Sequence, residues 1–356
     1  MWLRAAQAAK PPDWLRLHGQ RTRGTDMKDK ERIVVTGAGG FIGHHLVKYL
    51  TARGHWVRGV DLKAPEFEAT AAQEFELLDL RRFDNCLIAT RGAEQVYHLA
   101  ANMGGIGFIE TFKGEIVRDN TMINMNTIEA ARINGVRRFL FSSSACVYPG
   151  YRQNSADVTP LKEEDAYPAD AEDGYGWEKL YMERTCRHYH EDFGLETRVV
   201  RFHNIYGPLG TYDGGREKSP AAICRKVALA EDGEEIEVWG DGNQTRSYCY
   251  IDDCVEGLYL LMQSHYTEPL NLGTDRLVSV NELVEMVARI AGKRIRKRYD
   301  LTKPQGVRGR NSDNSRLRQV LGWEPRTPLE EGLTVTYRWI REELRKAGRL
   351  GAQAIA

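Results

Sequence analysis

The stretch RIVVTGAGGFIG, residues 32–43, decides the fold of this chain. It starts with a β-branched apolar run, which predicts a buried strand, and continues as a glycine-rich turn that opens an amphipathic helix. Gly37 allows the tight turn, Gly40 the close approach of a pyrophosphate, and Gly43 the close packing of helix on strand. The start of the helix offers N–H groups and a positive dipole end to phosphate. The stretch therefore predicts a dinucleotide-binding unit.

Strand-like and helix-like segments keep alternating downstream of this unit, up to about Gly207. The further predicted strands are 56–61, 74–80, 95–101, 137–144 and 197–207, and the predicted helices lie at about 82–90, 120–134 and 175–193. Such alternation implies a parallel sheet with right-handed crossovers. The predicted fold class is therefore α/β, a Rossmann-type doubly wound parallel sheet. Beyond Gly207 the alternation breaks down, which predicts a smaller, interleaved C-terminal domain.

The composition argues against several classes of protein. Lys plus Arg and Asp plus Glu both number 50, and a formal net charge of zero is unlike a large nucleic-acid-binding surface. No run approaches the roughly 20 apolar residues of a membrane-spanning helix. Six cysteines without CxxC spacing predict a reduced, cytoplasmic location and no metal site. We therefore expect neither a nucleic-acid nor a membrane partner.

A carboxylate at the end of the second predicted strand indicates which dinucleotide binds. Asp61 is placed to accept hydrogen bonds from a ribose 2′-hydroxyl and to repel a 2′-phosphate, which favours NAD, although nearby Lys63 leaves NADP open. Asp79, at the end of the third strand, is predicted to contact the adenine. The predicted cofactor-binding residues are Gly37, Gly40, Phe41, Ile42, Gly43, Asp61, Asp79, Tyr175 and Lys179.

A Tyr-x-x-x-Lys pair, Tyr175 and Lys179, falls on one face of a predicted helix, one turn apart. A phenol has an ordinary pKa of about 10 and is a poor base at neutral pH. A neighbouring ammonium and the positive nicotinamide favour the phenolate and are expected to lower that pKa. Ser144, at the end of a predicted strand, supplies a hydroxyl that can orient a substrate alcohol beside Tyr175. The pattern predicts an acid–base centre next to a nicotinamide.

These motifs resemble the extended short-chain dehydrogenase/reductase family, in its nucleotide-sugar-modifying branch. The matching stretches are GAGGFIG, His98–Ala101, SSACVY at Ser143–Tyr148 and YGWEK at Tyr175–Lys179. Longer strings narrow the resemblance to the family of GDP-mannose 3,5-epimerases, and these are residues 101–109, 201–226, 239–247 and 306–314. The similarity runs from about Ile33 to Glu343.

The resemblance implies an isomerase that converts GDP-α-D-mannose into GDP-L-galactose, or into GDP-L-gulose when C5 alone inverts. Tightly held NAD takes the C4 hydride and later returns it, while Tyr175 takes the C4 hydroxyl proton. The 4-ketone acidifies C5 and C3, where Cys146 and Lys218 exchange protons on opposite faces of the sugar. Ala145 and Cys146 stand where dehydratase relatives carry acidic residues, which argues against dehydration. The implied catalytic residues are Tyr175, Lys179, Cys146, Lys218 and Ser144.

The resemblance also implies the substrate contacts. They are Gly104, Ser144, Ala145, Cys146, Asn204, Glu217, Lys218, Ser219, Lys226, Gln244, Thr245, Arg246 and Arg310, with Arg308 as an alternative to Arg310. Lys226, Arg246 and Arg310 are expected to hold the diphosphate, because arginine grips phosphate oxygens with two N–H groups.

The expected organisation has four parts. Residues 1–28 are a disordered leader or result from a mis-assigned start, with Met27 favoured as the true one. Residues 29–204 with 244–274 form the NAD-binding domain, residues 205–243 with 275–345 form the nucleotide-sugar domain, and residues 346–356 form a tail. The resemblance further implies a homodimer. Two rival hypotheses are another NAD-dependent nucleotide-sugar enzyme, such as a 4-epimerase, and a catalytically silent dinucleotide-binding sensor.

Overall fold

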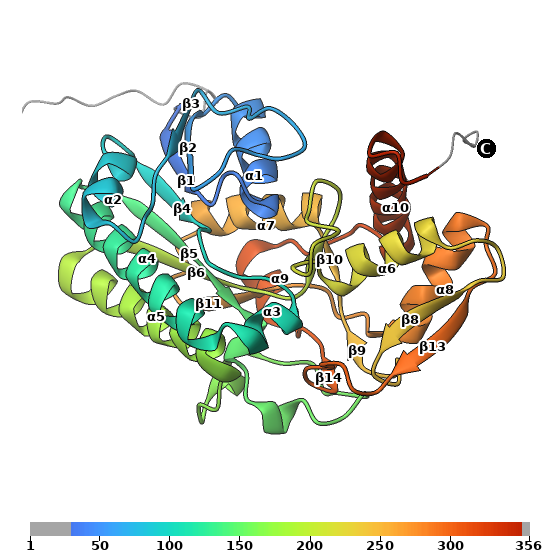
Figure 1. Ribbon diagram of the computed structural model, residues 1–356. Helices are drawn as coiled ribbons and strands as arrows, with labels where there is room; N and C mark the ends of the chain where they lie inside the picture. Colours follow the sequence, from blue (N-terminus) through green and yellow to red (C-terminus); the bar gives the residue numbers. More distant parts are fainter. Residues whose placement is uncertain (1–29, 351–356) are drawn as a thin grey trace, which may run out of the picture. The chain divides into compact units, whose positions relative to one another are not determined.

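A seven-stranded parallel sheet forms the centre of the computed structural model, which describes residues 30–350 (Figure 1). Its strands are β1 (Arg32–Thr36), β2 (Trp56–Asp61), β3 (Glu74–Leu77), β4 (Gln95–His98), β5 (Arg138–Ser144), β6 (Glu196–Phe202) and β11 (Pro269–Leu272). They are ordered β11-β6-β5-β4-β1-β2-β3. The order reverses between β1 and β4, and ligands of doubly wound sheets bind at the carboxyl ends of strands at such a reversal. The predicted fold class is confirmed.

Helices cover both faces of this sheet. On one face lie α1 (Phe41–Ala52) and α7 (Ile251–Gln263), and on the other lie α2 (Phe83–Thr90), α4 (Lys113–Ile133) and α5 (Asp173–Phe193). Strand β1 explains this arrangement, because Ile33 and Val35 belong to the apolar core beneath α1, whereas Val34 belongs to the core beneath α4. A strand buried on both faces reads as a continuous apolar run, as it does here.

The remaining elements lie beside the carboxyl ends of the strands. Helices α6 (Ser219–Leu229), α8 (Val280–Ala291) and α10 (Leu329–Lys346) pack together, next to the parallel pair β8 (Glu235–Trp239) and β13 (Arg296–Asp300). The shorter elements are α3 (Ile106–Thr111), β7 (Ile205–Tyr206), β9 (Thr245–Arg246), β10 (Cys249–Tyr250), β12 (Val278–Ser279), β14 (Gly309–Arg310) and α9 (Ser315–Leu321). Side chains of β7, β10, β12 and α9, together with those of α6, α8, α10 and β8, continue the core beneath α1 and α7.

The observed elements follow the predicted ones closely, with two clear exceptions. The strand predicted at 197–207 ends at Phe202, and Ile205–Tyr206 form the separate strand β7, which pairs with β10. The helix predicted at 120–134 begins at Lys113, and the short helix α3 directly before it was not predicted. The first two turns of α4 carry Gly114 and several charged residues, which hide the apolar periodicity. Only Ile116 and Asp119 are buried in these two turns. Tertiary packing of that face decides where the helix starts.

Some of the predicted segments lie outside residues 30–350, which the structure describes. The expected leader, residues 1–28, and residues 351–356 of the expected tail lie outside the described residues. From Glu31 onward the described chain forms one compact unit, so the two-domain division stays a prediction. Among residues 30–350, no helix has the length and apolar character needed to cross a membrane.

Candidate active site

The glycine turn between β1 and α1 has the shape of a phosphate cradle. Gly37 adopts φ of +73°, and a Cβ atom there would lie 2.9 Å from the backbone nitrogen of Ala100. A Cβ atom on Gly43 would lie 2.1 Å from the Gly37 carbonyl oxygen. Gly40 precedes the first residue of α1, and no side chain caps this helix start. Its first N–H groups, from Phe41 onward, are therefore available to a phosphate.

Asp61 and its neighbours define the ribose side of this turn. The Asp61 carboxylate accepts hydrogen bonds from the backbone N–H groups of Gly39 at 2.9 Å and Leu62 at 2.6 Å. A carboxylate has about four acceptor positions, so it retains capacity for a ribose hydroxyl. Lys63 pairs with Glu66 at 3.6 Å, which weakens it as a 2′-phosphate ligand. The cradle and its donor set fit NAD.

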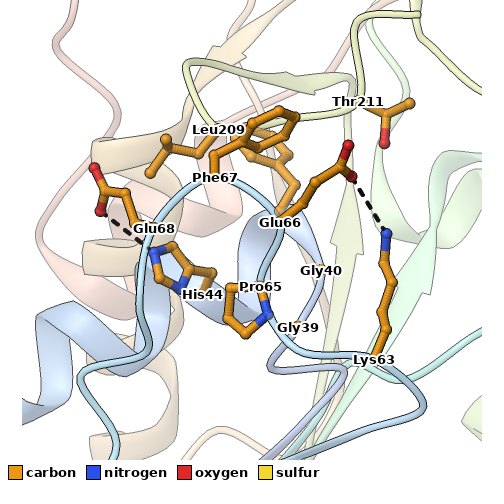
Figure 2. Close-up of a pocket in the computed structure, with 11 residues that line it drawn as sticks. Gly39, Gly40, His44, Lys63, Pro65, Glu66, Phe67, Glu68, Leu209 and Thr211 are labelled. Atoms are coloured by element: carbon orange, nitrogen blue, oxygen red, sulfur yellow. Dashed lines mark hydrogen bonds and ion pairs between the residues drawn. The ribbon is translucent and has the colours of Figure 1, made fainter.

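A cavity lies directly beside the turn. Figure 2 shows the segment from Lys63 to Glu68 arching over Gly39 and Gly40, with His44 of α1 below and Leu209 above. His44 faces Glu68, with Nε2 and Oε2 3.5 Å apart. Asp79, the predicted adenine contact, does not line this cavity, and its contact with adenine stays a prediction. It pairs with Arg81, whose hydrogen bonds lower the pKa of Asp79.

Tyr175 and Lys179 lie in the first half of α5, and both are buried. The Lys179 ammonium nitrogen is 5.6 Å from the centre of the Tyr175 ring and 4.8 Å from that of Phe141. Burial lowers the pKa of Lys179 and raises that of Tyr175, while a hydrogen bond with Ser144 acts on Tyr175 in the opposite direction. Lys179 alone therefore does not produce the predicted lowering of the phenol pKa. The positive nicotinamide is the other expected contribution.

A buried polar network supports Lys179 from behind. Glu178 Oε1 lies 3.8 Å from the Lys179 ammonium nitrogen and accepts a hydrogen bond from Asn120, while Glu178 Oε2 accepts one from Asn124, both at 2.9 Å. His98 donates to Asn124 through Nε2 at 2.9 Å, and burial lowers its pKa to about 3, so the ring is neutral. Sequence reasoning missed Glu178 and both asparagines, because their partners are distant in the chain.

Cys146 is close enough to both Lys218 and Tyr175 to interact with them electrostatically. The Cys146 backbone N–H donates to the Ser144 hydroxyl at 3.2 Å, and Arg310 Nη1 lies 3.6 Å from the Cys146 sulfur. The Lys218 side chain makes no hydrogen bond or ion pair within residues 30–350, and its ammonium interacts electrostatically with Cys146 and Arg310. Burial raises the pKa of Cys146 and lowers that of Lys218. A thiol and an amine are thus gathered at one place.

Gly176 allows α5 to approach this cluster. A Cβ atom on Gly176 would lie 2.3 Å from the Cys146 carbonyl oxygen, a backbone atom that cannot turn aside. Replacement by alanine is expected to push Cys146 and Tyr175 apart and to lower activity by about 100-fold, the cost of misplacing reacting groups by about 1 Å. Gly114→Ala is the matched control, because nothing lies within 4 Å of its added Cβ. Equal steady-state activities of the two variants would contradict this account.

The predicted phosphate ligands differ in whether a carboxylate of the protein already binds them. Arg246 has no acidic partner among residues 30–350 and donates only to the carbonyl oxygens of Thr245 at 2.8 Å and Gln305 at 3.3 Å. Burial lowers its pKa to about 10. Arg308 is paired with both carboxylate oxygens of Asp241, at 2.8 and 2.9 Å. Arg246 is therefore better suited to bind an anion than Arg308.

Several of the other predicted contacts already have partners within the protein. Lys226 donates to the Glu237 carbonyl at 2.8 Å, and Asn204 donates to the Ser247 carbonyl at 2.9 Å. The further partners are Arg225 for Glu217, Tyr248 for Ser219, the Trp239 carbonyl for Gln244 and the Ala156 carbonyl for Thr245. The Gln244 Oε1 atom is buried and has no hydrogen-bond partner among residues 30–350. Ala145 is buried, and a Cβ atom on Gly104 would meet Phe108 at 2.9 Å.

Glu172 belongs to this cluster but was not predicted. It accepts a hydrogen bond from Arg310, which itself was expected at the diphosphate. Glu172 directly precedes α5, one helical turn before Tyr175, and this spacing was a usable signal. Within the described part of the chain, no three His, Cys, Asp or Glu side chains are placed to hold a metal ion.

Known proteins resemble the chain over most of its length. Residues 33–273 match the NAD dependent epimerase/dehydratase family. The chain is 50% identical over 323 residues to the GDP-mannose 3,5-epimerase of Arabidopsis thaliana, covering 90% of this chain and 85% of that protein. It is 50% identical over 320 residues to GDP-mannose 3,5-epimerase 1 of Oryza sativa subsp. japonica, covering 89% and 84%.

A solved structure shows the same architecture. UDP-glucose 4-epimerase of Thermotoga maritima with UDP-glucose superposes with a TM-score of 0.80 at 29% identity, over 88% of this chain and 99% of that one. The predicted resemblance to GDP-mannose 3,5-epimerases, the isomerase class and the NAD dependence are confirmed by these matches. From its glycine cradle, its Tyr175–Lys179 pair and this similarity, the chain belongs to the NAD dependent epimerase/dehydratase family.

Proposed function

We propose that the protein binds NAD and converts GDP-α-D-mannose into GDP-L-galactose, with GDP-L-gulose as the product of C5 inversion alone. The observation that carries this proposal is that Cys146 interacts electrostatically with both Lys218 and Tyr175 in the interior of the protein. Inversion of a carbon centre requires a proton to leave one face and another to arrive at the opposite face. A thiol and an amine at one place supply the two groups. The identity with the Arabidopsis enzyme supports the substrate.

The residues of the chain divide the work at the sugar. NAD, when bound, supplies reversible hydride transfer at C4. Tyr175 accepts the C4 hydroxyl proton, and Ser144 orients that hydroxyl through the hydrogen bond that it shares with Tyr175. The resulting ketone acidifies the hydrogens at C5 and C3. Cys146 and Lys218 remove and deliver these protons, and Tyr175 finally returns its proton to the C4 oxygen.

The alternative of a 4-epimerase has a different requirement. Such an enzyme inverts only C4 and needs no acid–base pair in addition to the tyrosine. The thiol and the partner-free ammonium of Lys218 then have no role. Incubation of the protein with GDP-mannose, followed by hydrolysis and identification of the sugar, tests the proposal. L-galactose and L-gulose are the expected products, whereas a C4 epimer of mannose would contradict it.

The two predicted domains have different tasks in this proposal. Residues 29–204 with 244–274 hold NAD at the glycine cradle, and residues 205–243 with 275–345 hold the GDP portion. Arg246 belongs to the stretch 244–274, which directly follows the segment 205–243, and we propose that it also reaches the GDP portion. Its guanidinium is largely removed from water and has no carboxylate partner among residues 30–350. A bound phosphate would supply the Arg246 guanidinium with a negatively charged hydrogen-bond partner.

Arg246→Gln is expected to raise the KM for GDP-mannose by about 10- to 100-fold and to change kcat much less. A hydrogen bond to a charged group contributes about 1.5–3 kcal/mol, and the phosphate contacts are the same before and during the reaction. Arg308→Gln is the matched control, because Arg308 already forms an ion pair with Asp241 and is therefore not expected to bind the phosphate. Steady-state kinetics of both variants decide the matter, and equal KM values would remove Arg246 from the substrate site.

A homodimer and a cytoplasmic location are parts of the same proposal. Exposed apolar side chains on the outer faces of α4 and α5 support the dimer, and they are Val117, Met122, Ile133, Trp177, Tyr181 and Phe193. Two helices of one protomer can cover such a surface against the same two of its partner. All six cysteines are free thiols, as is typical of a reducing compartment.

A further inference from the structure

Glu172 is attached to Cys146 through the backbone as well as through its side chain. The Glu172 N–H donates to the Cys146 carbonyl at 2.9 Å, and the Gly176 N–H donates to the Glu172 carbonyl at 2.7 Å. The Glu172 side chain is 25% exposed and interacts electrostatically with the Cys146 thiol. The start of α5 therefore holds this carboxylate against the sulfur.

Arg310 connects the same two side chains. Its Nη1 lies 3.6 Å from the Cys146 sulfur, its Nη2 donates to Glu172 Oε1, and its Nε donates to Gln153 Oε1 at 2.7 Å. The residue is only 7% exposed. A planar guanidinium held along three directions has little freedom to rotate. Glu172 thus fixes the position of the cation nearest to the sulfur.

We propose that Glu172 is a positioning residue, which holds Arg310 against Cys146 and keeps the sulfur as a neutral thiol in the free enzyme. A carboxylate beside a thiol disfavours the thiolate, and a guanidinium favours it. In the Glu172–Arg310 pair, the carboxylate raises the pKa of the Cys146 thiol and the guanidinium lowers it. The catalytic meaning of this role rests on the proposed epimerase function, whereas the contacts themselves do not.

The surroundings of Cys146 show why Glu172 matters more than other charges. The ionisable side chains that face the sulfur are Glu172 and Tyr175, Lys179, Lys218, Arg246 and Arg310. Among them Glu172 is the carboxylate, and it has a larger effect on the pKa of Cys146 than Arg310 has. Burial raises the pKa of Cys146 most, Glu172 raises it next, and Arg310 lowers it. Without the carboxylate, the remaining neighbours are cations and a neutral phenol.

Alkylation of Cys146 by iodoacetamide tests the inference on the full-length protein without any substrate. The thiolate is the reacting form, and Cys146 is partly accessible whereas the other five cysteines are buried. The rate of modification, followed by mass spectrometry between about pH 6 and about pH 10, gives the midpoint of its ionisation. For Glu172→Gln we expect this midpoint to fall by about one pH unit, which is about a tenfold faster reaction below it.

Two further variants sharpen the result. Asp173→Asn removes the neighbouring charge, whose partner is Lys113 at 2.9 Å, and is expected to leave the midpoint unchanged. Glu172→Asp keeps a carboxylate and is expected to stay nearer the wild-type midpoint than Glu172→Gln, which a purely structural role does not predict. An unchanged midpoint in a folded Glu172→Gln protein would overturn the inference, as would equal shifts in Glu172→Asp and Glu172→Gln. Lack of turnover of GDP-mannose, by contrast, would count only against the proposed function.

Discussion

Replacement of Cys146 by alanine is expected to lower epimerisation of GDP-mannose by about 10²- to 10⁴-fold, the usual contribution of a general acid or base. The variant loses the thiol that exchanges a proton at the sugar. It retains Tyr175 and Lys179, so oxidation at C4 is expected to continue. The folded structure should survive, since Cys146 is only partly buried and alanine removes a single heavy atom.

The measurement is the rate of product formation together with the thermal unfolding temperature. Cys146→Ser is the companion variant, because it restores a side chain of similar size with a far weaker acid. We expect it to be nearly as inactive as Cys146→Ala, which separates proton transfer from packing. A Cys146→Ala protein with full activity would instead favour a 4-epimerase, which has no use for the thiol.

Glu183→Gln is expected to destabilise the protein by about 3–5 kcal/mol, the usual effect of breaking a buried ion pair. Glu183 and Arg201 are both almost fully buried, and two hydrogen bonds of 2.7 and 2.9 Å join them. Glu183 also accepts a hydrogen bond from Ser143, which directly precedes the predicted catalytic Ser144. The glutamine leaves a buried guanidinium without its counter-charge.

Urea unfolding measures this effect, and the loss is a large fraction of the roughly 5–15 kcal/mol that stabilise an ordinary domain. Glu342→Gln is the control, because its partner Arg345 is an exposed neighbour on the same helix. Exposed pairs contribute about 0–1 kcal/mol. A Glu183→Gln protein that unfolds at the same urea concentration as the Glu342→Gln protein would show that the Arg201 charge is compensated elsewhere.

The parts of the fold that sequence reasoning predicted are those fixed by local spacing. The glycine turn needs Gly37 and Gly43 because a Cβ atom at either position would collide with nearby backbone atoms. Strand β1 is apolar throughout because helices cover both of its faces. The start of α4 at Lys113 was not predicted, because tertiary packing rather than an apolar repeat determines it.

In the candidate site too, residues related by local spacing were predicted, and contacts determined by tertiary packing were not. Tyr175 and Lys179 were found because one helical turn separates them. The structure gives Arg310 two protein neighbours that were not predicted as its partners, Cys146 and Glu172, and its expected contact with the diphosphate stays a prediction. A long cationic side chain can reach several partners, and packing selects among them, so motif positions do not determine its contacts. Glu178 was not predicted for a similar reason, because its two asparagine partners lie on another helix, α4.

Incubation of the protein with GDP-mannose in heavy water tests the central claim most directly. Mass spectrometry and proton NMR of the sugar then report where solvent deuterium enters. The account predicts deuterium at C5 and C3, together with new signals of L-sugars. A sugar that is changed only at C4, or left unchanged, and that carries no solvent deuterium would contradict the proposed function.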